Sequence, residues 1–291
     1  MSDRKLIYFI LTTLLATALI LGVIVLAFKN KNELKVFFLD VGQGDAILIE
    51  SGNNQVLIDA GRSGKTVLDR LGKVMPFWDR KIEVLLITHP DADHYGGFNE
   101  IINNYKVENV IKTDVTSTSG EWLTLIDKLK NKRVTEIKST QGTAIVFPSG
   151  ARLNILYPFF KNIPSNTDKN DTSIVSKLVF GENKFLFTGD LSAEGENILL
   201  DKNINISANF LKVGHHGSHY STGENFLEKV NPKDAIISVG KNNSYGHPHQ
   251  EILDRFKNRM IQVWRTDQDG IIEYDCKNIN QPCQAMKYPS F

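Results

Sequence analysis

The chain of 291 residues has little cysteine and almost no net charge, and both shortages limit what kind of protein it is. Its two cysteines, Cys276 and Cys283, lie far along the chain from the histidine-rich segments, which argues against a thiolate metal site. A formal net charge of +1 gives no overall attraction to nucleic acid, so a polyanion would need a local basic surface. The chain also lacks internal repeats and low-complexity tracts, which leaves one globular domain of ordinary composition, 41% hydrophobic and 23% charged.

Two features remain open to two interpretations each. The cysteines could close a small disulfide loop, which fits an oxidising compartment, or remain unpaired thiols. The most basic segment, residues 128–133, ends an amphipathic stretch, where cations suit both solvent and the helix macrodipole. The alternative interpretation of that segment is a patch that follows the phosphates of a nucleic acid.

One long hydrophobic run stands at the N-terminus. Residues 6–28 carry no charged side chain and, as a helix, can cross a hydrocarbon core of about 30 Å. Basic residues flank the run on both sides, so charge asymmetry gives no membrane orientation. Residues 25–27 resemble a cleavage site, which makes a secreted protein with a cleaved signal peptide the alternative to a single-pass membrane protein. Either way, residues after about 33 are expected outside the cytoplasm.

The pattern of hydrophobic and turn residues divides the chain and predicts its elements. The expected parts are a tail (1–5), a transmembrane helix (6–28), a linker (29–33), a globular domain (34–275) and a C-terminal tail (276–291). Strands are expected at 34–39, 46–50, 55–59, 84–87, 108–112, 143–147, 151–157, 173–180, 184–188, 208–213, 234–239, 261–265 and 270–274. Helices are expected at 64–75, 97–104, 121–132, 192–200, 222–230 and 249–258. Strand-rich halves with helices outside predict an α/β (α+β) fold of two sheets packed face to face.

The segment Thr88-His89-Pro90-Asp91-Ala92-Asp93-His94-Tyr95-Gly96-Gly97 follows a predicted buried strand and carries four potential metal ligands. His89 and Asp91 are two residues apart, so both can point to one side of an extended turn. Asp93 and His94 are adjacent and point elsewhere, so the two pairs suit the two ions of a two-metal site. The alternative is a polar loop in which Asp93 only caps a helix.

Polar side chains follow two later strands as well. Asp190 ends a strand in Thr188-Gly189-Asp190, where a carboxylate either bridges two ions or caps the next helix. The segment Val213-Gly214-His215-His216-Gly217-Ser218-His219 also follows a strand. Adjacent histidines favour metal binding or acid–base chemistry over a purely structural role.

A third histidine cluster is Tyr245-Gly246-His247-Pro248-His249. His247 lies between glycine and proline and is expected to donate a proton or to contact a phosphate. His249 is expected to begin a helix.

Together these segments resemble the metallo-β-lactamase fold of hydrolases. Its pattern runs from an Asp at a strand end, here Asp59, through an H-x-H-x-D-H loop to a Gly-Asp and a late His. More narrowly, the chain resembles the C-terminal hydrolase domain of the ComEC-type DNA-uptake competence channel over roughly residues 34–275. The motifs that carry this resemblance are Leu39-Asp40-Val41-Gly42-Gln43-Gly44-Asp45-Ala46, Leu57-Ile58-Asp59-Ala60-Gly61, the His89–Gly97 loop, His215-His216-Gly217-Ser218 and Tyr245-Gly246-His247-Pro248.

The resemblance implies an αββα sandwich with two divalent metal ions at one sheet edge. The expected metal ligands are His89, Asp91 and Asn170 for one ion, Asp93, His94 and His215 for the other, and Asp190 as the bridge. The expected catalytic residues are Asp93, His216 and His247, with His215 and His216 able to exchange roles. The residues expected to orient the ligands from behind are Asp40, Asp59 and Ser218.

Two departures from the general family pattern bear on the metal. Asp91 stands where most members have their second histidine, and residues 170–173 replace a histidine expected about 20 residues before Asp190. Oxygen donors favour Mn²⁺ or Mg²⁺ over Zn²⁺, whereas the ligands around His94 still suit Zn²⁺. We therefore expect Mn²⁺ or Zn²⁺.

The resulting hypothesis is a membrane-anchored, metal-dependent phosphodiesterase or nuclease that acts on single-stranded DNA or another phosphodiester outside the cytoplasm. Coordination lowers the pKa of water toward about 7 and so supplies a nucleophile. The single hydrophobic run is too little for a DNA-translocating pore, so any channel or envelope protein would be a separate partner. The alternatives are hydrolysis of a lactone, β-lactam or thioester, and a non-catalytic module that binds nucleic acid or cell-wall polymer.

Overall fold

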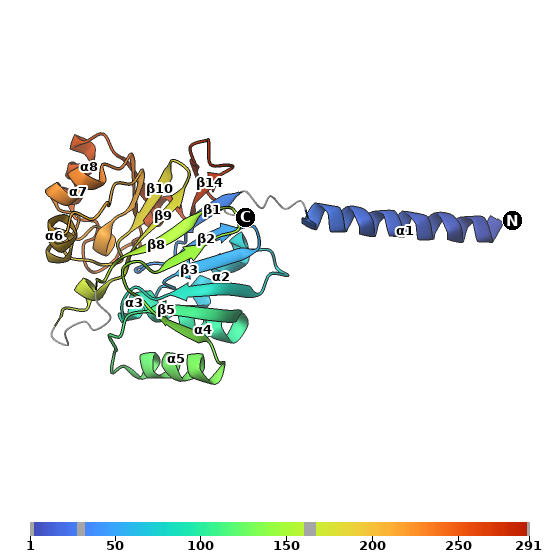
Figure 1. The fold of residues 1–291 in the computed structure, drawn as a ribbon, viewed down its shortest axis with the longest axis horizontal. Helices are drawn as coiled ribbons and strands as arrows, with labels where there is room; N and C mark the ends of the chain where they lie inside the picture. The colour runs from blue at the N-terminus through green and yellow to red at the C-terminus, as the bar shows by residue number, and fades with distance from the viewer. Residues whose placement is uncertain (1–2, 28–32, 160–166, 290–291) are drawn as a thin grey trace.

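The structure is a computed structural model that describes residues 3–27, 33–159 and 167–289. After an N-terminal helix, α1 (Asp3–Ala27), the chain forms two sheets that pack face to face, with helices on both outer faces (Figure 1). This confirms the predicted αββα sandwich.

The first sheet has eight strands among the described residues, in the order β15-β14-β1-β2-β3-β4-β5-β6. Its strands β3 to β6 are parallel to one another, and a helix follows each of β3, β4 and β5, as parallel connections require. The strands are β1 (Leu34–Phe38), β2 (Ile47–Ser51), β3 (Asn54–Ile58), β4 (Lys81–Leu86), β5 (Lys106–Lys112), β6 (Thr135–Lys138), β14 (Ile272–Cys276) and β15 (Gln284–Lys287).

The second sheet runs in the order β13-β12-β11-β10-β9-β8-β7. Its strands β10 to β13 are parallel, whereas β7 to β10 form an antiparallel meander. The strands are β7 (Ala144–Val146), β8 (Arg152–Tyr157), β9 (Val175–Phe180), β10 (Asn183–Phe187), β11 (Phe210–Lys212), β12 (Asp234–Ile237) and β13 (Gln262–Arg265).

Amphipathic helices cover the outer face of each sheet. The first sheet is covered by α2 (Gly64–Val74), α4 (Phe98–Asn104) and α5 (Gly120–Asn131). The second sheet is covered by α6 (Ala193–Asp201), α7 (Glu224–Val230) and α8 (Gln250–Asn258). Serine side chains cap the starts of α2, α5 and α6 by accepting backbone N–H bonds. The described residues also form the short helices α3 (Ala92–Tyr95) and α9 (Thr266–Asp269) and the 3₁₀ turns η1 (Asn170–Thr172) and η2 (Gly214–Gly217).

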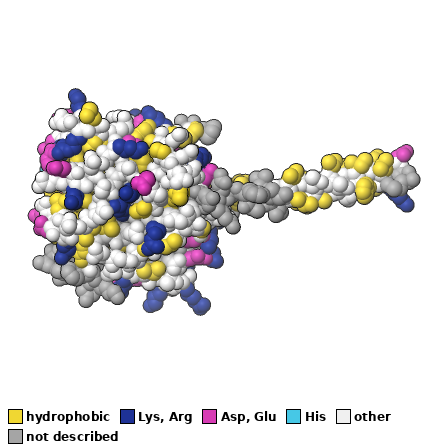
Figure 2. Space-filling view, turned by 45° about the horizontal axis from the view of Figure 1, so that its top comes forward, with side chains coloured by type: hydrophobic (Ala, Val, Ile, Leu, Met, Phe, Trp, Pro, Cys, Tyr) yellow, Lys and Arg dark blue, Asp and Glu magenta, His cyan; other side chains and the backbone are white. Residues whose placement is uncertain are grey.

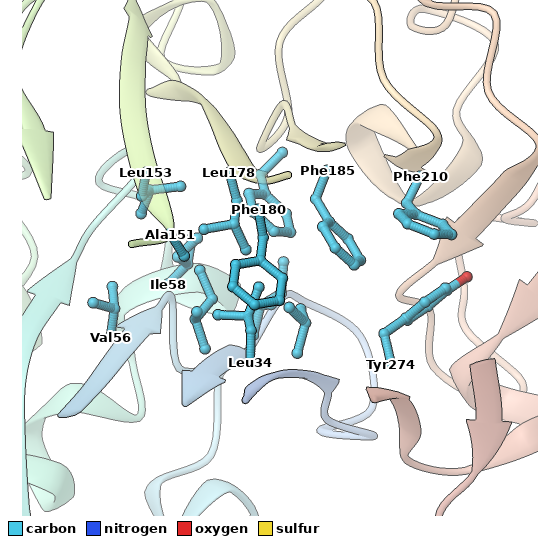
Figure 3. Close-up of a cluster of buried hydrophobic side chains, with 14 of the residues drawn as sticks. Leu34, Val56, Ile58, Ala151, Leu153, Leu178, Phe180, Phe185, Phe210 and Tyr274 are labelled. Atoms are coloured by element: carbon cyan, nitrogen blue, oxygen red, sulfur yellow. The ribbon is translucent and has the colours of Figure 1, made fainter. Parts of the chain in front are cut away.

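The main core lies between the two sheets (Figure 3). Val56 and Ile58 of β3 face side chains of the second sheet in this cluster, among them Leu153 of β8 and Leu178 of β9. Large apolar side chains of this kind stabilise a sandwich because each buries most of its surface. The sandwich holds fixed the strand ends from which the polar loops project.

The helix α1 stands apart from this core. Its described side chains are exposed, and residues 3–22 have a mean hydropathy of 1.9, which makes the helix a candidate membrane span (Figure 2). The predicted transmembrane helix 6–28 coincides with it up to residue 27. Residue 28 and residues 29–32 of the predicted linker lie outside the described residues.

The C-terminal region differs from the expected tail. The expected domain boundary falls inside β14, and residues 284–287 return as β15, which pairs antiparallel with β14. The sequence prediction missed β15 and β6 because both are edge strands whose side chains are mostly or entirely exposed, so no hydrophobic alternation marks them.

The structure pairs Cys276 with Cys283 in a disulfide, which selects one of the two interpretations left open by the sequence. The bond closes the turn between β14 and β15. Asn183 of the second sheet accepts the Cys283 N–H at 2.9 Å and donates to the Gln281 carbonyl at 2.8 Å, so this turn joins the two sheets.

Candidate metal centre

The predicted ligands come together at one edge of the sandwich. Asp59 follows β3, the His89–His94 loop follows β4, Asp190 follows β10, and His215 and His216 follow β11. The carboxyl ends of these four strands point to the same edge, so residues from distant parts of the chain meet there. The His94 ring centroid lies 4.2 Å from that of His89 and 5.4 Å from that of His216.

Asp59 fixes two of the three buried histidines. Its Oδ1 accepts the Thr88 N–H at 2.9 Å, and its Oδ2 accepts the Thr88 hydroxyl at 2.6 Å and His94 Nδ1 at 2.8 Å. The Thr88 hydroxyl donates its only proton to Asp59, so it can only accept a hydrogen bond from His89 Nδ1, which lies 3.0 Å away. Both imidazoles therefore carry their proton on Nδ1 and leave Nε2 as the ligand atom.

His216 is oriented in the same way from the other sheet. Its Nδ1 donates to the Ser238 carbonyl at 2.9 Å. Its Nε2 therefore faces the same cluster of side chains, made up of His89, His94 and Asp190. His215 and His216 have φ values of 46° and 56°, in the left-handed region that costs a residue with a Cβ of order 1 kcal/mol or more. This strained backbone conformation directs the two rings toward the other candidate ligands.

The atoms that face the cluster have no hydrogen-bond partner in the described residues. They are Nε2 of His89, His94 and His216, together with Oδ1 of Asp190, and all four are buried. Two groups of these side chains, His89/His94/Asp190 and Asp93/His94/His216, have donor atoms within 4.8 Å of one another. Buried polar atoms without partners are costly, and convergent imidazole and carboxylate groups match the preferences of divalent transition metals. The donor set therefore fits the metal ions that the fold implies.

Asp190 lies between the two groups of ligands. Its Oδ2 is 3.2 Å from His94 Nε2, 3.4 Å from His216 Nε2 and 3.9 Å from His215 Nε2. Despite burial, the neighbouring imidazoles of His216 and His94 hold the pKa of Asp190 well below its usual range. Asp190 does not cap the next helix, because Ser192 does so. Its position suits a carboxylate shared by two ions.

The histidines respond in opposite directions to the buried carboxylates. Burial lowers the pKa of His89 to about 4, so the ring is neutral and ready to bind a cation. For His94 and His216 the carboxylates outweigh burial, and Asp190 above all raises the pKa of both rings. A metal ion must displace the extra protons from these two rings, so metal binding should release protons.

A buried ion pair, which the sequence prediction missed, lies directly behind the ligands. Lys212 of β11 forms an ion pair with Asp45, and its Nζ donates to the Gly189 carbonyl at 3.3 Å. Asp45 also lies 3.4 Å from His216 Nδ1. Asp45 belongs to the quoted Leu39–Ala46 motif. The sequence signal for Lys212 is a charged residue near the end of a mostly apolar predicted strand, 208–213.

The remaining predicted ligands, and His247 with them, line a pocket of about 180 Å³ in front of the three buried histidines. Asp91 lies at its mouth, where its carboxylate is 3.8 Å from His89 Nε2 and 3.2 Å from Lys169 Nζ. Asp91 is the N-cap residue of α3, but its side chain makes no capping hydrogen bond. Asp93 lies within α3, so the alternative in which Asp93 only caps a helix does not hold. The full lining is Gln43, Asp91, Asp93, Asn170, Asp190, His215, His216, Tyr245 and His247.

His247 stands on the far wall of this pocket. Its ring centroid is 5.6 Å from that of His215 and 6.4 Å from that of His216, and its Nδ1 is buried without a partner. Burial and the neighbouring His216 lower the pKa of His247 to about 4. The ring is therefore neutral at pH 7, which favours a hydrogen-bonding role over the expected donation of a proton by an imidazolium. His249 is the N-cap residue of α8, as expected.

Two predicted supporting residues lie elsewhere. The Asp40 carboxylate accepts from Arg70 Nη2 at 3.0 Å and lines a different cavity, so Asp45 takes the position that we expected for Asp40. Ser218 ends η2, where its hydroxyl accepts the Tyr220 N–H at 3.3 Å. Ser218 therefore shapes the turn and does not contact the imidazole rings through any described hydrogen bond.

Close backbone contacts hold the His89–Gly97 loop, called the ligand loop below, against the first sheet. A Cβ at Gly97 would lie 2.1 Å from the Ala60 carbonyl, and one at Gly44 would lie 2.0 Å from the Asp93 carbonyl. The Gly97 N–H donates to the Gly61 carbonyl at 2.9 Å. Only glycine permits this approach, so the Gly96-Gly97 pair fixes where the ligand loop ends.

The fold and this centre define the class of protein. The model of the metallo-β-lactamase superfamily matches residues 39–241, and the chain belongs to this superfamily.

Among curated proteins, the chain is similar to competence proteins. It is 34% identical over 274 residues to ComE operon protein 3 of Bacillus subtilis, which covers 85% of this chain and 34% of that protein. It is 29% identical over 262 residues to competence protein ComA of Neisseria gonorrhoeae, which covers 90% of this chain and 35% of that protein. The chain thus spans about a third of the length of the curated relatives it matches.

Two solved structures share the fold. The metallo-β-lactamase fold protein YhfI of Bacillus subtilis matches with a TM-score of 0.56 at 12% identity, covering 84% of this chain and 100% of that one. Tm1679, described as a metal-dependent hydrolase of the β-lactamase superfamily, matches with a TM-score of 0.51 at 16% identity, covering 80% and 95%. At these identities the comparisons show the fold alone.

Proposed function

We propose that this protein is a metal-dependent phosphodiesterase that cleaves DNA in a competence-related process. The observation that carries the proposal is the convergence of His94 Nε2 and His216 Nε2 on the carboxylate of Asp190, at 3.2 Å and 3.4 Å, with buried His89 in the same group of donor atoms. The similarity to competence proteins supports DNA as the substrate, and the family supports hydrolysis as the reaction.

We assign the ligands of the two ions with one change from the sequence prediction. His89 and Asp91, with Asn170, would hold one ion; Asp93, His94 and His216 would hold the other; and Asp190 would be shared. His216 replaces His215 because its Nδ1 is anchored on a carbonyl and its Nε2 lies 3.5 Å from Asp93. Divalent ions, when bound here, would lower the pKa of water and neutralise charge on a phosphate.

The other residues act on the substrate. His215 faces the pocket and would contact a non-bridging or leaving oxygen of the phosphodiester, and His247 would do so from the opposite wall. Asp59 and Asp45 would hold the ligand rings from behind, with Lys212 balancing the charge of Asp45. Such supporting partners usually change metal affinity or activity 10–100-fold when they are removed.

The metal preference follows from the donor set. Asp91 and Asn170 offer oxygen where most members of the family offer nitrogen, which favours Mn²⁺ at that position. The other position, with two imidazoles, suits Zn²⁺ as well.

The direct test is hydrolysis by the full-length chain in detergent, after removal and re-addition of metal. We expect Mn²⁺-dependent cleavage of single-stranded DNA and of bis(p-nitrophenyl) phosphate, and at least a 100-fold loss of both in Asp190→Asn. Absence of cleavage by a protein that retains its metal would refute the proposal. Faster turnover of a lactone or of nitrocefin would instead assign the centre to carbonyl substrates.

We further propose that α1 anchors the domain in a membrane with the domain outside the cytoplasm. The exposed apolar surface of α1 and the disulfide between Cys276 and Cys283 support this placement. Detection of the chain only in the culture medium, shortened at residues 25–27, would contradict it in favour of a cleaved signal peptide.

A further inference from the structure

One edge of the sandwich exposes two large aromatic side chains that the metal centre does not use. Phe77 is 78% exposed and Trp78 is 64% exposed, and their ring centroids are 4.9 Å apart in an edge-to-face arrangement. They lie in the loop that joins α2 to β4. Adjacent aromatic side chains that remain in water are unfavourable unless something covers them.

The loop is held firmly by the start of the first sheet. Asp79 accepts Gln55 Nε2 of β3 at 2.9 Å, and the Arg80 carbonyl accepts the Lys106 N–H of β5 at 2.8 Å. The loop backbone is therefore fixed on both sides, and the two rings are held outward on a rigid base.

The same edge is where the chain enters the domain from α1. In the strand register Lys35 faces Glu50 and Ser51 faces Asn54, so Leu34 and the start of β3 are two strands apart, about 10 Å. Only seven residue steps separate Ala27 from Leu34, and these span at most about 25 Å. If α1 spans a bilayer, this edge is held within reach of its surface.

Other side chains at this edge suit a membrane surface. A groove lies beside the loop of residues 75–80, called the aromatic loop below, and three basic side chains line it: Arg80, Lys106 and Lys132. In the described part of the chain, neither Arg80 nor Lys132 has a carboxylate within 4 Å, and Lys106 meets only Glu108, at 3.8 Å. Ile279, in the turn closed by the disulfide, is 50% exposed at the end of β14 that lies beside Leu34.

We propose that this edge docks on the membrane that α1 enters. Trp78 and Phe77 insert at the level of the headgroups, and Arg80, Lys106 and Lys132 face anionic lipids. Aromatic and basic side chains are the residues that prefer this interface. The inference rests on the proposed membrane anchoring by α1.

Docking at this edge has a consequence for the metal centre. The aromatic loop lies at the start of β4 and the ligand loop lies at its end, and six strand residues at about 3.3 Å each separate the two by about 20 Å. Figure 1 shows α3, which carries Asp93 and His94, on the other side of the domain from the start of β1. The centre therefore opens away from the lipid, toward a substrate that arrives from solution.

The test is the quenching of tryptophan fluorescence by brominated lipids. The full-length chain is reconstituted into vesicles of phosphatidylcholine with 30% phosphatidylglycerol, with and without bromine on the acyl chains. The chain has three tryptophans, none of them in α1; Trp122 is buried and Trp264 is half-buried. We expect Trp78→Phe to lose at least half of the quenched fluorescence.

Two variants in the Trp78→Phe background locate the contact. Ile279→Trp should restore quenching, because residue 279 lies at the proposed docking edge. Tyr220→Trp, at an exposed position near the metal centre, should not. Equal quenching of the original chain and Trp78→Phe, or restoration by Tyr220→Trp, would overturn the docking.

Two further measurements separate this inference from the proposals on which it rests. Failure of the chain to float with the vesicles would refute the anchoring and the docking with it. Cleavage of bis(p-nitrophenyl) phosphate should stay within twofold in Trp78→Phe. Loss of docking with unchanged cleavage would leave the proposed function standing, whereas intact docking without cleavage in the original chain would refute only that function.

Discussion

The three buried histidines each donate Nδ1–H to a fixed acceptor, and this separates His216 from its neighbour His215. His216 is anchored on the Ser238 carbonyl, whereas His215 is partly exposed at the pocket. We therefore predict that His216→Ala binds one ion fewer per chain, while His215→Ala keeps its metal and loses about 10²–10⁴-fold in turnover. Elemental analysis after dialysis measures the first effect, and single-substrate kinetics measure the second. A loss of metal in His215→Ala alone would reverse the assignment.

Asp59 supports two rings from a fully buried position, so its charge should matter to metal affinity. We predict that Asp59→Asn weakens metal binding about 10–100-fold, because the amide is a poorer acceptor for His94 Nδ1 and the Thr88 hydroxyl. Competition with a fluorescent chelator measures the affinity. Asp40→Asn is the matched control, since Asp40 pairs with Arg70 away from the centre. Equal effects of the two substitutions would show that Asp59 has no special role.

The sequence identifies the side chains that gather in the candidate centre better than the residues that contact those side chains from behind. Histidines and aspartates gathered at strand ends can be recognised by spacing, and His89, His94 and Asp190, which the sequence selects as candidate ligands, do lie together in the fold. Asp45 and Lys212 were missed because their partners lie more than 150 residues apart in the chain, and only the packing of the two sheets brings them together. The sequence prediction selected Asp40 instead of Asp45, because the motif that contains both does not show which of the two side chains points toward the histidines.

Among the elements, helices α6 and α7 are joined by a buried carboxylate. Glu196 of α6 is 1% exposed and accepts the N–H groups of Thr222 at 2.6 Å and Gly223 at 2.9 Å, just before α7 begins. Burial raises the pKa of Glu196 to about 7, from an ordinary value of 4.5. The folded state therefore holds this proton more tightly than the unfolded chain does.

The sign of the resulting pH dependence follows from linkage. The contribution of Glu196 to the free energy of unfolding is fully present below about pH 4.5 and is lost as the pH rises through about 7. We predict that Glu196→Gln removes this dependence, which amounts to about 3 kcal/mol over the full range. Urea unfolding of both proteins in detergent, at pH 5 and pH 8, measures it. The same pH dependence in both proteins would show that Glu196 does not titrate in this range.

Regular elements with a buried face were also the ones that the sequence could predict. The run Phe185-Leu186-Phe187 and the spacing of Trp122, Leu125 and Leu129 in α5 reflect burial, and burial is what the hydrophobic pattern records. β6 has four exposed side chains and exists because its backbone pairs with β5. The local sequence carries no record of a strand that is held only by its neighbour.

For the whole molecule, the chain offers a simple measure of its compartment. Its only two cysteines are paired in the structure, and the bond closes the turn between β14 and β15 at the edge near the start of β1. A disulfide in a short loop persists in an oxidising environment and is reduced in the cytoplasm. The oxidation state of Cys276 and Cys283 therefore reports on which side of the membrane the domain lies.

We predict that a polyethylene-glycol maleimide adds no mass to the chain in freshly lysed cells until a reductant is present, and then adds two labels per chain. Reduction should cost about 2 kcal/mol of stability, because the closed loop is short, and should leave metal content unchanged, because the metal centre lies at the opposite edge of the sheets. A Cys276→Ser/Cys283→Ser variant is the control that takes up no label. Full labelling without reductant would show that the domain lies in a reducing compartment, and a substrate outside the cytoplasm would then be excluded while the metal chemistry remained.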